Sequence, residues 1–211
     1  VRLLDAVGGS VRTFEQLGRT YLPDSPGTSL AVELLNQVPV VSAVMGSVAG
    51  LPAIEACLCH FNVMVKDTSQ VFAGGPPVVK AALGYNITKE ELGDHRSQVF
   101  TAGVIDNLAD SEEEAFEMIR KFLSFMPSNV WKKPERIETD DDPERRDEGL
   151  LSIIPRNPRR SYDPRKILEH VLDRDSFFEI APHHGRARIT GLARANGYPI
   201  GVMINNPNHL G

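Results

Sequence analysis

The stretch from Pro39 to Val65 decides the fold; it is written PVVSAVMGSVAGLPAIEACLCHFNVMV. Its first part, residues 39–44, is apolar and β-branched, which predicts a buried strand. A glycine-punctuated loop at 46–50 follows, and residues 53–59 (AIEACLC) then predict a helix. Residues 61–65 (FNVMV) predict the next strand. This order of strand, glycine loop, helix and strand predicts an α/β layer.

Three further signals predict elements towards the C-terminus. Ser111 and Glu114 match a capping box, and apolar residues at helical spacing follow them, which predicts an amphipathic helix. Asp163 and Pro164 predict the start of another helix, with Asp163 as its N-cap. Asn196-Gly197 lies between two apolar runs and predicts a two-residue β-hairpin turn.

The composition is that of an ordinary globular protein. The chain has 211 residues, of which 41% are hydrophobic and 24% charged, with a formal net charge of -5. This acidic balance argues against a nucleic-acid partner, and the apolar runs are too short for a membrane span. The chain opens at Val1 without a signal-peptide pattern and ends just after a predicted strand, so we expect the natural protein to extend beyond both ends.

The chain divides into two lobes and a linker. Residues 132–150 hold eight acidic and five basic side chains with two prolines, a composition typical of a linker. We therefore predict one lobe at residues 1–131 and a second at 151–211. The acidic run Asp140–Asp142 could suggest a metal site, but a solvated charged loop is the better interpretation in this composition.

The cysteines and paired histidines give no metal site. Cys57 and Cys59 are separated by a single residue, and cysteines at that spacing rarely form a disulfide. We therefore expect both thiols to pack in the core, in a protein from a reducing compartment. His183-His184 has no third ligand at a suitable spacing. We predict no metal in this chain.

A resemblance to a known family rests on five segments that occur in order, namely VMGSVAG (44–50), FNVMVKDTS (61–69), VFAGGPPVVK (71–80), EELG (90–93) and AGV (102–104). With SYDPR at 161–165, they resemble the carboxyltransferase (β) subunits of biotin-dependent acyl-CoA carboxylases. The propionyl-CoA and methylcrotonyl-CoA carboxylase group is the most similar. The resemblance extends from about Leu3 to Gly211.

The resemblance implies a crotonase-like (ClpP-like) α/β fold, a superhelix of ββα units in two related lobes. Residues 1–131 would be the later part of the N-terminal carboxyltransferase lobe, and residues 151–211 the first part of the C-terminal lobe. Residues 5–9 (DAVGG) resemble a family element that is usually written Leu-x-Asp-Ser-Gly-Gly-Ala-Arg, although an extra residue and Ser10 break the match.

The resemblance also implies a site built from backbone groups. The N–H groups of Gly50 and Leu51 would form an oxyanion hole for the thioester oxygen of an acyl-CoA. The substrate-binding residues that it implies along the same loop and cleft are Gly46, Ser47, Val48, Ala49, Gly75 and Pro76. From the residues alone, a tight strand-to-helix turn is the other interpretation of this loop.

The implied reaction moves a carboxyl group from carboxybiotin to the α-carbon of an acyl-CoA. Carboxybiotin releases CO2, the biotin ureido group takes the α-proton, and the enolate attacks CO2 while N–H groups stabilise its oxygen. Biotin would be carried on a partner, a biotin carboxylase or biotin carrier subunit, and the enzyme would be a homo-oligomer, typically a hexamer. The compartment would be the cytoplasm or the mitochondrial matrix. Because the biotin-side oxyanion hole follows residue 211 in the family, we expect the 211-residue chain to be inactive alone.

Three positions depart from the family pattern and keep two alternatives open. Leu51 replaces a usual glycine, and Asp94 and Gln98 replace a usual glycine and histidine. The chain could instead serve a biotin-dependent acyl-CoA decarboxylase, or act as an inactive scaffold. His95, with polar neighbours, is expected at the surface. A basic run, Arg156, Arg159 and Arg160, could meet CoA phosphates or form a solvated patch.

Overall fold

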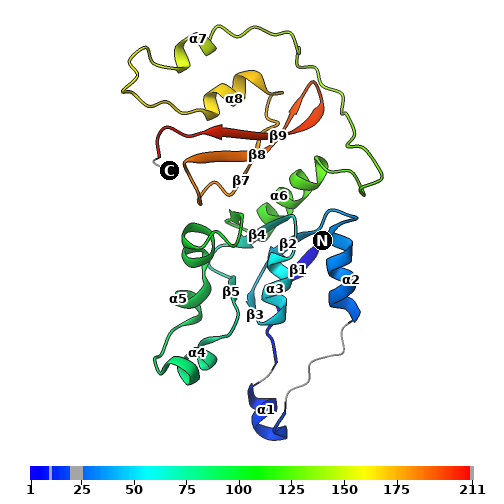
Figure 1. Cartoon of the computed structure of the whole chain (residues 1–211), viewed down its shortest axis with the longest axis vertical. Coiled ribbons are helices and arrows are strands. Elements are labelled where there is room, and N and C mark those ends of the chain that lie inside the picture. Colours follow the sequence, from blue (N-terminus) through cyan, green and yellow to red (C-terminus); the bar gives the residue numbers. More distant parts are fainter. Residues whose placement is uncertain (10, 20–25, 210–211) are drawn as a thin grey trace.

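Three sheets organise the part of the chain that the computed structural model describes, residues 1–9, 11–19 and 26–209 (Figure 1). The first is wholly parallel, in the order β1 (Arg2–Leu4), β2 (Val41–Val44), β4 (Phe61–Val65) and β6 (Asn107–Ala109). The second joins β3 (Ser47–Ala49) to β5 (Gln70–Phe72) in parallel. The third is antiparallel, in the order β7 (Phe178–Ile180), β8 (Arg188–Ala195) and β9 (Tyr198–Asn205). Ser10 and residues 210–211, which belong to predicted segments, lie outside the described residues.

Two ββα units stack in register, as predicted. The first runs β2, β3 and α3 (Leu51–Cys57), and the second runs β4, β5 and α4 (Pro76–Leu83). Val41 pairs with Phe61 in one sheet and Ser47 with Gln70 in the other, so each strand of the first unit lies beside its counterpart in the second. Every residue of β2 and β4 is buried, which is the environment of a parallel strand covered on both faces.

The remaining helices surround these sheets. They are α1 (Val11–Leu17), α2 (Pro26–Leu35), α5 (Lys89–Gly93), a π-helix η1 (Arg96–Thr101), α6 (Glu112–Ser124), α7 (Leu150–Ile153) and α8 (Arg165–Val171). None of the helices in the described residues combines the length and apolar character that crossing a membrane demands.

The predicted helix start at Ser111 is confirmed, but its capping box is half formed. The Ser111 hydroxyl accepts the Glu114 N–H at 3.2 Å, whereas the Glu114 carboxylate accepts an N–H from Asp110 instead of Ser111. A complete box forms at the start of α5, where Thr88 and Glu91 bond to each other's backbone. The cap orients α6 so that Ala115, Ile119 and Phe122 face the core.

The other two predicted boundaries are also found. Helix α8 begins at Arg165 with Pro164 as its N-cap, so the prediction of Asp163 as N-cap is wrong by one residue, although the Asp163 carboxylate accepts the N–H of Arg165 at 3.0 Å. Asn196 and Gly197 have φ angles of 50° and 78°, the pair of positive values that a type I′ turn requires. The hairpin of β8 and β9 therefore forms where the sequence predicts it.

The third sheet shares an apolar core with the first. Phe61 of β4 stacks on Phe122 of α6 with 4.9 Å between ring centroids, and Phe178 of β7 meets the edge of Phe61 at 5.4 Å. Ile180 and Leu192 pack against the same cluster. Helix α6 consequently lies between the two sheets (Figure 1), and its apolar stripe is covered from both sides.

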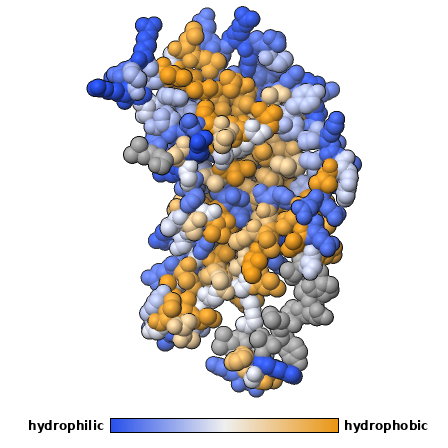
Figure 2. Space-filling model, viewed as in Figure 1, coloured by the Kyte–Doolittle hydropathy of each residue, from blue (hydrophilic) through white to orange (hydrophobic). Residues whose placement is uncertain are grey.

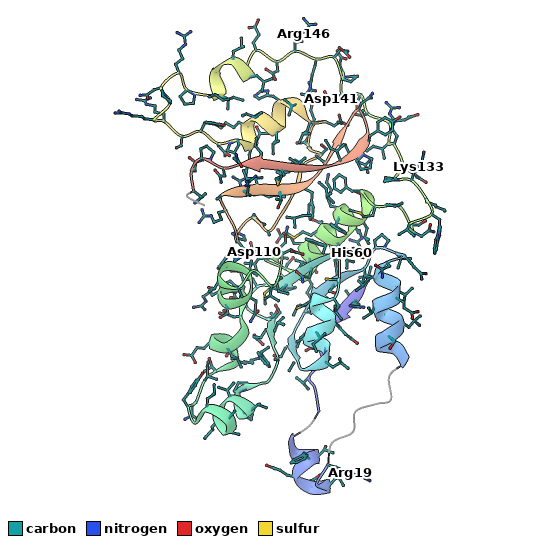
Figure 3. All side chains as sticks on the ribbon, in the orientation of Figure 1. Arg19, His60, Asp110, Lys133, Asp141 and Arg146 are labelled. Atoms are coloured by element: carbon teal, nitrogen blue, oxygen red, sulfur yellow. The ribbon has the colours of Figure 1, made fainter. Side chains whose placement is uncertain are left out.

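We call the part of the molecule from β1 to α6 the first region and the part from α7 to β9 the second region. The charged segment after Trp131 lies along the second region and forms no strand or helix before α7. Asp140 and Asp142 are exposed, as a solvated loop requires, but Asp141 (labelled in Figure 3) departs from that prediction, because its side chain is only 7% exposed and pairs with Arg145 and Arg174. These two cations compensate the carboxylate that packing removes from water. Among the described residues no group of three or more potential ligands could hold a metal ion.

The prediction that both cysteines pack in the core is wrong. Cys57 is exposed and Cys59 is half-buried. Helix α3 turns Ala53 and Ala56 inwards, which leaves Cys57 on the outer side. Partial burial, with a smaller contribution from Asp106, raises the pKa of the Cys57 thiol, so the thiolate is disfavoured there.

Candidate functional site

The turn from β3 into α3 has a backbone that requires glycine. Gly50 has φ of 71°, and its N–H donates to the carbonyl of Phe72 at 3.2 Å, which continues the pairing of β3 with β5. The N–H of Leu51 is the first of the helix, and no described residue accepts it. Of the two predicted donors, Leu51 alone therefore has an N–H that is not already bonded within the described chain.

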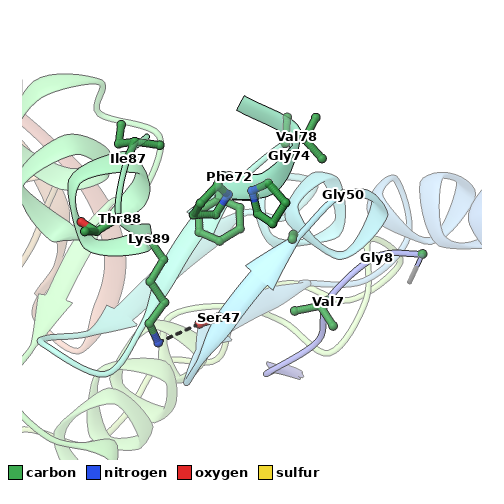
Figure 4. Close-up of a pocket in the computed structure, with 16 residues that line it drawn as sticks. Val7, Gly8, Ser47, Gly50, Phe72, Gly74, Val78, Ile87, Thr88 and Lys89 are labelled. Carbon is green, nitrogen blue, oxygen red and sulfur yellow. Dashed lines mark hydrogen bonds between the residues drawn. The ribbon is translucent and has the colours of Figure 1, made fainter. Parts of the chain in front are cut away.

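A cavity of about 780 Å³ lies beside this turn (Figure 4). We call it the glycine pocket. Four segments form its wall, namely residues 7–9, residues 47, 49 and 50 of β3 and its turn, residues 72–78, and residues 87–89. The wall is mostly apolar, and Figure 2 shows apolar side chains gathered over the adjacent helix α4. The exposed apolar residues of α4 include Val78 and Leu83.

Two glycines allow the segments of the glycine pocket to approach closely. A Cβ on Gly8 would lie 3.3 Å from the Ala49 carbonyl oxygen, and a Cβ on Gly50 would lie 3.5 Å from the Cα of Gly8. Close by, a Cβ on Gly46 would lie 2.2 Å from a carboxylate oxygen of Asp5. The N-terminal segment that resembles the family element thus packs directly on the Gly46–Gly50 turn.

The predicted site residues divide between the pocket, the core and a second cavity. Those that line the glycine pocket are Ser47, Ala49, Gly50, Gly75 and Pro76. Val48 is fully buried, and its side chain packs in the core cluster below the turn. Gly46 faces Asp5, and Leu51 lies on the other side of Gly50. Successive residues of a strand point to opposite faces, which explains why Val48 points into the core while Ser47 and Ala49 line the glycine pocket.

The second cavity, of about 630 Å³, is named here the Leu51 cavity. It shares Gly50, Phe72 and Ala73 with the glycine pocket, and no charged residue is among those that line it. Its remaining wall is formed by Leu51, Ala53, Ile54, Cys57, Leu58, Val71, Gln98 and Val104. The Gly50 turn is therefore bordered by two cavities, and the side chain of Leu51 faces the second one.

Lys89 is a pocket residue that the sequence analysis missed. Its Nζ lies 3.4 Å from the hydroxyl of Ser47 across the glycine pocket (Figure 4), and Ser47 in turn donates to the side chain of Gln70 at 2.6 Å. The signal that could have found it is the Thr88-x-x-Glu91 capping box, which predicts a helix that begins at Lys89. Hydrogen bonds from the backbone and hydroxyl of Thr88 lower the pKa of Glu91 and keep the box ionised.

The positions that depart from the family pattern have structural partners. Asp94 accepts the N–H groups of Arg96 and Ser97, the first two residues of the π-helix, at 2.9 and 3.3 Å. The expectation of a surface His95 is wrong, because His95 is 9% exposed and its ring meets the edge of Phe100 at 5.7 Å. The carbonyl of Gln98 accepts two N–H groups of the following loop.

The matching glycine of that motif has a packing role. A Cβ on Gly93 would lie 2.3 Å from the carbonyl oxygen of Val71, so only glycine lets α5 lie against β5. The next residue of β5, Phe72, is part of the wall of both cavities. This contact links the Glu-Leu-Gly motif to the shape of the glycine pocket.

The predicted basic and histidine candidates lie elsewhere. Arg156, Arg159 and Arg160 are exposed on the loop between α7 and α8, at the opposite end of the molecule from α4 (Figure 1). His183 and His184 are exposed in the turn after β7. The ring of His183 meets the edge of Phe100 at 4.8 Å, which is a packing contact between the two regions.

Comparison with known proteins identifies the family. Residues 29–211 match the profile of the carboxyl transferase domain. The chain is 39% identical over 170 residues to the propionyl-CoA carboxylase carboxyltransferase subunit of Haloferax mediterranei, covering 81% of this chain and 33% of that protein. It is 35% identical to the methylmalonyl-CoA decarboxylase subunit alpha of Veillonella parvula, with the same shares of both chains. The chain thus spans about a third of the length of these curated relatives.

A solved structure supports the fold. The transcarboxylase 12S crystal structure, described as a hexamer assembly with hydrolysed methylmalonyl-coenzyme A bound, is similar with a TM-score of 0.79 at 27% identity. The match covers 84% of this chain and 35% of that one. Together with the stacked ββα units, this similarity confirms the predicted crotonase-like fold.

Proposed function

The chain belongs to the carboxyl transferase domain family, and we propose that it is part of the carboxyltransferase component of a biotin-dependent acyl-CoA carboxylase. The reaction moves a carboxyl group from carboxybiotin to the α-carbon of an acyl-CoA. In this proposal residues 1–131 are the later part of an N-terminal lobe, 132–150 a charged linker, and 151–211 the first part of a C-terminal lobe.

The observation that carries this proposal is the glycine pocket at the Gly50 turn. Its wall is mostly apolar, and an apolar surrounding strengthens any hydrogen bond to a developing negative charge. The unbonded N–H of Leu51, which lines the Leu51 cavity on the other side of Gly50, is our candidate donor to the thioester oxygen as it gains charge in the enolate. Gly50 holds the turn that aims this donor, while Ser47, Val48 and Ala49 form the strand leading to it and Gly46 comes directly before that strand.

The two cavities give the proposed roles a geometry. Gly75 and Pro76 form the wall of the glycine pocket opposite the turn, and we assign them to substrate binding. The Leu51 side chain narrows the second cavity, where a glycine would leave it open. We therefore expect Leu51 to limit the size of the group that reaches the oxyanion donor.

The partners and compartment follow from the proposed reaction. Biotin would be carried on a biotin carboxylase or biotin carrier subunit, and acyl-CoA would be the second substrate. We propose a homo-oligomer, with a hexamer as the first state to test, in the cytoplasm or the mitochondrial matrix. The 211-residue chain alone is expected to be inactive, because it spans about a third of the length of its curated relatives.

A decarboxylase is the second candidate, and its support is the 35% identity to the Veillonella parvula subunit. That activity runs the same half-reaction in the opposite direction. An inactive scaffold is the third, because the Gly50 N–H is already bonded to Phe72 and Leu51 replaces the usual glycine. Turnover by the complete protein separates the scaffold from both enzymes, and the direction of net flux with carboxybiotin separates the enzymes from each other.

The test uses the longest natural form of the polypeptide, with the 211-residue chain alongside. Each is incubated with free biotin and malonyl-, methylmalonyl- or methylglutaconyl-CoA, and loss of CO2 is followed by mass spectrometry. We expect biotin-dependent decarboxylation of at least one substrate by the longer form and none by the shorter chain. Failure of every substrate with a folded, complete protein would contradict the enzyme proposal, and turnover by the short chain would contradict the site assignment.

A matched pair of glycine variants tests the position of the site. Gly50→Ala and Gly84→Ala place the same methyl group at φ angles of 71° and 81°. A Cβ added at Gly84 would have no atom within 4 Å, and Gly84 lines neither cavity. The Gly84→Ala variant therefore measures the effect of placing alanine at a positive φ angle away from the site. We expect a loss of activity of about a hundredfold for Gly50→Ala, as for a lost oxyanion contact, and activity within about twofold of wild type for Gly84→Ala. Equal activity in the two variants would place the site elsewhere.

A further inference from the structure

The glycine pocket combines apolar walls with a single cation. Of the described residues that line it, Lys89 alone is charged, and the other side chains are apolar apart from Ser47 and Thr88. The Leu51 cavity, which borders the same turn, has no charged lining residue. A ligand of the glycine pocket would therefore match its lining best if an apolar part were joined to an anionic group.

The cation is held in place without being neutralised. The proton of the Ser47 hydroxyl is donated to Gln70, which is 1% exposed, so a lone pair of that hydroxyl accepts from Lys89 Nζ. Glu90 is the carboxylate nearest to Lys89 in this structure, with its oxygen 3.8 Å from Nζ. Both side chains of that pair are about half exposed, at 51% and 52%, so water screens it and the attraction is weak.

We propose that Lys89 binds an anionic group of the acyl-CoA thioester in the glycine pocket and that it sets the affinity and selectivity of this chain for its substrate. This inference rests on the proposed function. The anion has two possible sources in such a ligand: a phosphate of the CoA part, or the carboxylate of a carboxylated acyl group. The apolar wall from Phe72 to Val78 would bind the uncharged part of the same molecule.

The arrangement of the pocket supports a binding role for Lys89. Helix α5 is fixed at its start by the Thr88–Glu91 capping box and at its end by Gly93 against Val71. Lys89 is the first residue of that helix, and its side chain crosses the pocket to Ser47 on β3 (Figure 4). A cation anchored at both ends loses less side-chain entropy on binding an anion than a free lysine would.

The test measures ligand binding to the 211-residue chain and to the longest natural form by isothermal titration calorimetry at low ionic strength. Four ligands separate the anions: acetyl-CoA, malonyl-CoA, acetyl-pantetheine and malonyl-pantetheine. Lys89→Met removes the cation and keeps a side chain of similar length and helix propensity. Lys80→Met is the matched control, because Lys80 lies on α4 but does not line the pocket. Glu90→Gln removes the competing carboxylate.

We expect Lys89→Met to weaken binding of malonyl-CoA about threefold to tenfold, with Lys80→Met within about twofold of wild type and Glu90→Gln equal or tighter. Increasing salt should reduce the difference between wild type and Lys89→Met, since the contact is electrostatic. A loss confined to the two CoA ligands assigns the anion as a phosphate. A loss confined to the two malonyl ligands assigns it as the carboxylate.

The outcomes that overturn the proposal are distinct from those that overturn the proposed function. Equal binding of every ligand by wild type and Lys89→Met overturns the role of Lys89 and leaves the carboxyltransferase proposal standing. An equal loss for acetyl-pantetheine, which has no anion, also overturns it, because that result would indicate altered packing. If wild type in its longest form binds none of the CoA ligands, the proposed function fails, and the role of Lys89 fails with it.

Discussion

Glycines border a cavity in the first region of the molecule, whereas in the second region they allow backbone segments to pack closely. In the ββα stack, Gly8 and Gly50 lie against each other's backbone, and the turns around them leave the glycine pocket between them. In the antiparallel sheet, a Cβ on Gly191 would lie 2.3 Å from the carbonyl oxygen of Phe178, and one on Gly197 would lie 2.0 Å from that of Ile137. The same residue type therefore borders a pocket in the first region, where Gly93 also serves packing, whereas Gly191 and Gly197 serve packing in the second.

The difference follows from how the two sheets are connected. Parallel strands need crossover connections, so β3 and β5 end at the same edge, and the turns that follow them converge there. The antiparallel pair β8 and β9 is joined by a two-residue turn, which leaves no room for a pocket between the strands. We conclude that strand direction, more than glycine content, decides where this chain can hold a ligand.

The largest expected effect tests whether the two regions are separable at all. Phe122→Ala removes a ring that is 3% exposed and stacks on Phe61, which also contacts Phe178 of the second region. We expect a loss of about 4 kcal/mol in the free energy of unfolding, measured by urea titration. Hydrogen exchange should show protection lost in both regions.

Leu168→Ala is the control for that experiment. Leu168 is 6% exposed and belongs to a cluster made only of second-region residues. We expect a comparable loss of a few kcal/mol, but with increased exchange concentrated in residues 163–205. If Phe122→Ala left the β8–β9 hairpin fully protected, the shared core would not couple the two regions.

The next largest effect compares two glycines that have the same steric problem. Gly93→Ala and Gly191→Ala each place a Cβ 2.3 Å from a backbone carbonyl oxygen, and backbone cannot move aside as a side chain can. We expect each to destabilise the fold by about 3 kcal/mol in thermal or urea unfolding. When the affinity is expressed per folded molecule, Gly93→Ala should also weaken acyl-CoA binding, because α5 supports Phe72. Gly191→Ala should leave the affinity unchanged. Equal affinities for the two variants would break the proposed division between pocket and packing.

A smaller effect concerns the helix caps. Thr88→Ala and Ser111→Ala each remove a hydroxyl that accepts an N–H from the third helical residue. We expect each to cost about 1 kcal/mol of unfolding free energy. Thr88→Ala should also weaken ligand binding, by less than Lys89→Met, because it loosens the helix that carries Lys89. Ser111→Ala acts on α6, away from the pocket, and its ligand affinity should equal that of wild type.

The smallest expected effect is a pH dependence of the free energy of unfolding, caused by Asp106, which directly precedes β6 of the first sheet. Burial raises the pKa of Asp106, against a lowering by the Asn62 N–H that it accepts at 2.9 Å. A raised folded-state pKa means that the native protein binds more protons than the unfolded chain, so wild-type stability falls as pH rises through this carboxyl's titration range. Asp106→Asn removes this dependence while its amide oxygen can still accept the N–H. We expect the variant to gain stability relative to wild type between about pH 4 and pH 7, measured by urea unfolding at a series of pH values.

The elements with strong local signals could be predicted from the sequence. The strands 41–44 and 61–65, the Ser111 cap and the Asn196-Gly197 turn all appear where their residues indicate. Each depends on interactions within a few residues, so no distant part of the chain is needed to specify it. The family resemblance then extended the prediction from local elements to the ββα architecture.

The wrong predictions concern burial, which depends on how elements pack. Immediate neighbours predict a core position for Cys57 and a surface position for His95, but the exposure of Cys57 depends on which face α3 turns inwards, and His95 packs against the ring of Phe100. Asp141 pairs with Arg145, four residues away, and with Arg174, which lies beyond α8. The pattern of neighbouring residues does not predict which side of an element is covered.

The sequence by itself determined the fold family, the turn at Gly50 and the set of residues from which a site could be formed. Only the tertiary structure decided which of them face a cavity, that the N–H of Gly50 is bonded to the carbonyl of Phe72, and that Lys89 reaches Ser47, which lies 42 positions earlier in the sequence. The physical reason is that backbone conformation is set by short-range sterics and hydrogen bonds, whereas a cavity exists only where packed elements meet and fail to fill the space between them.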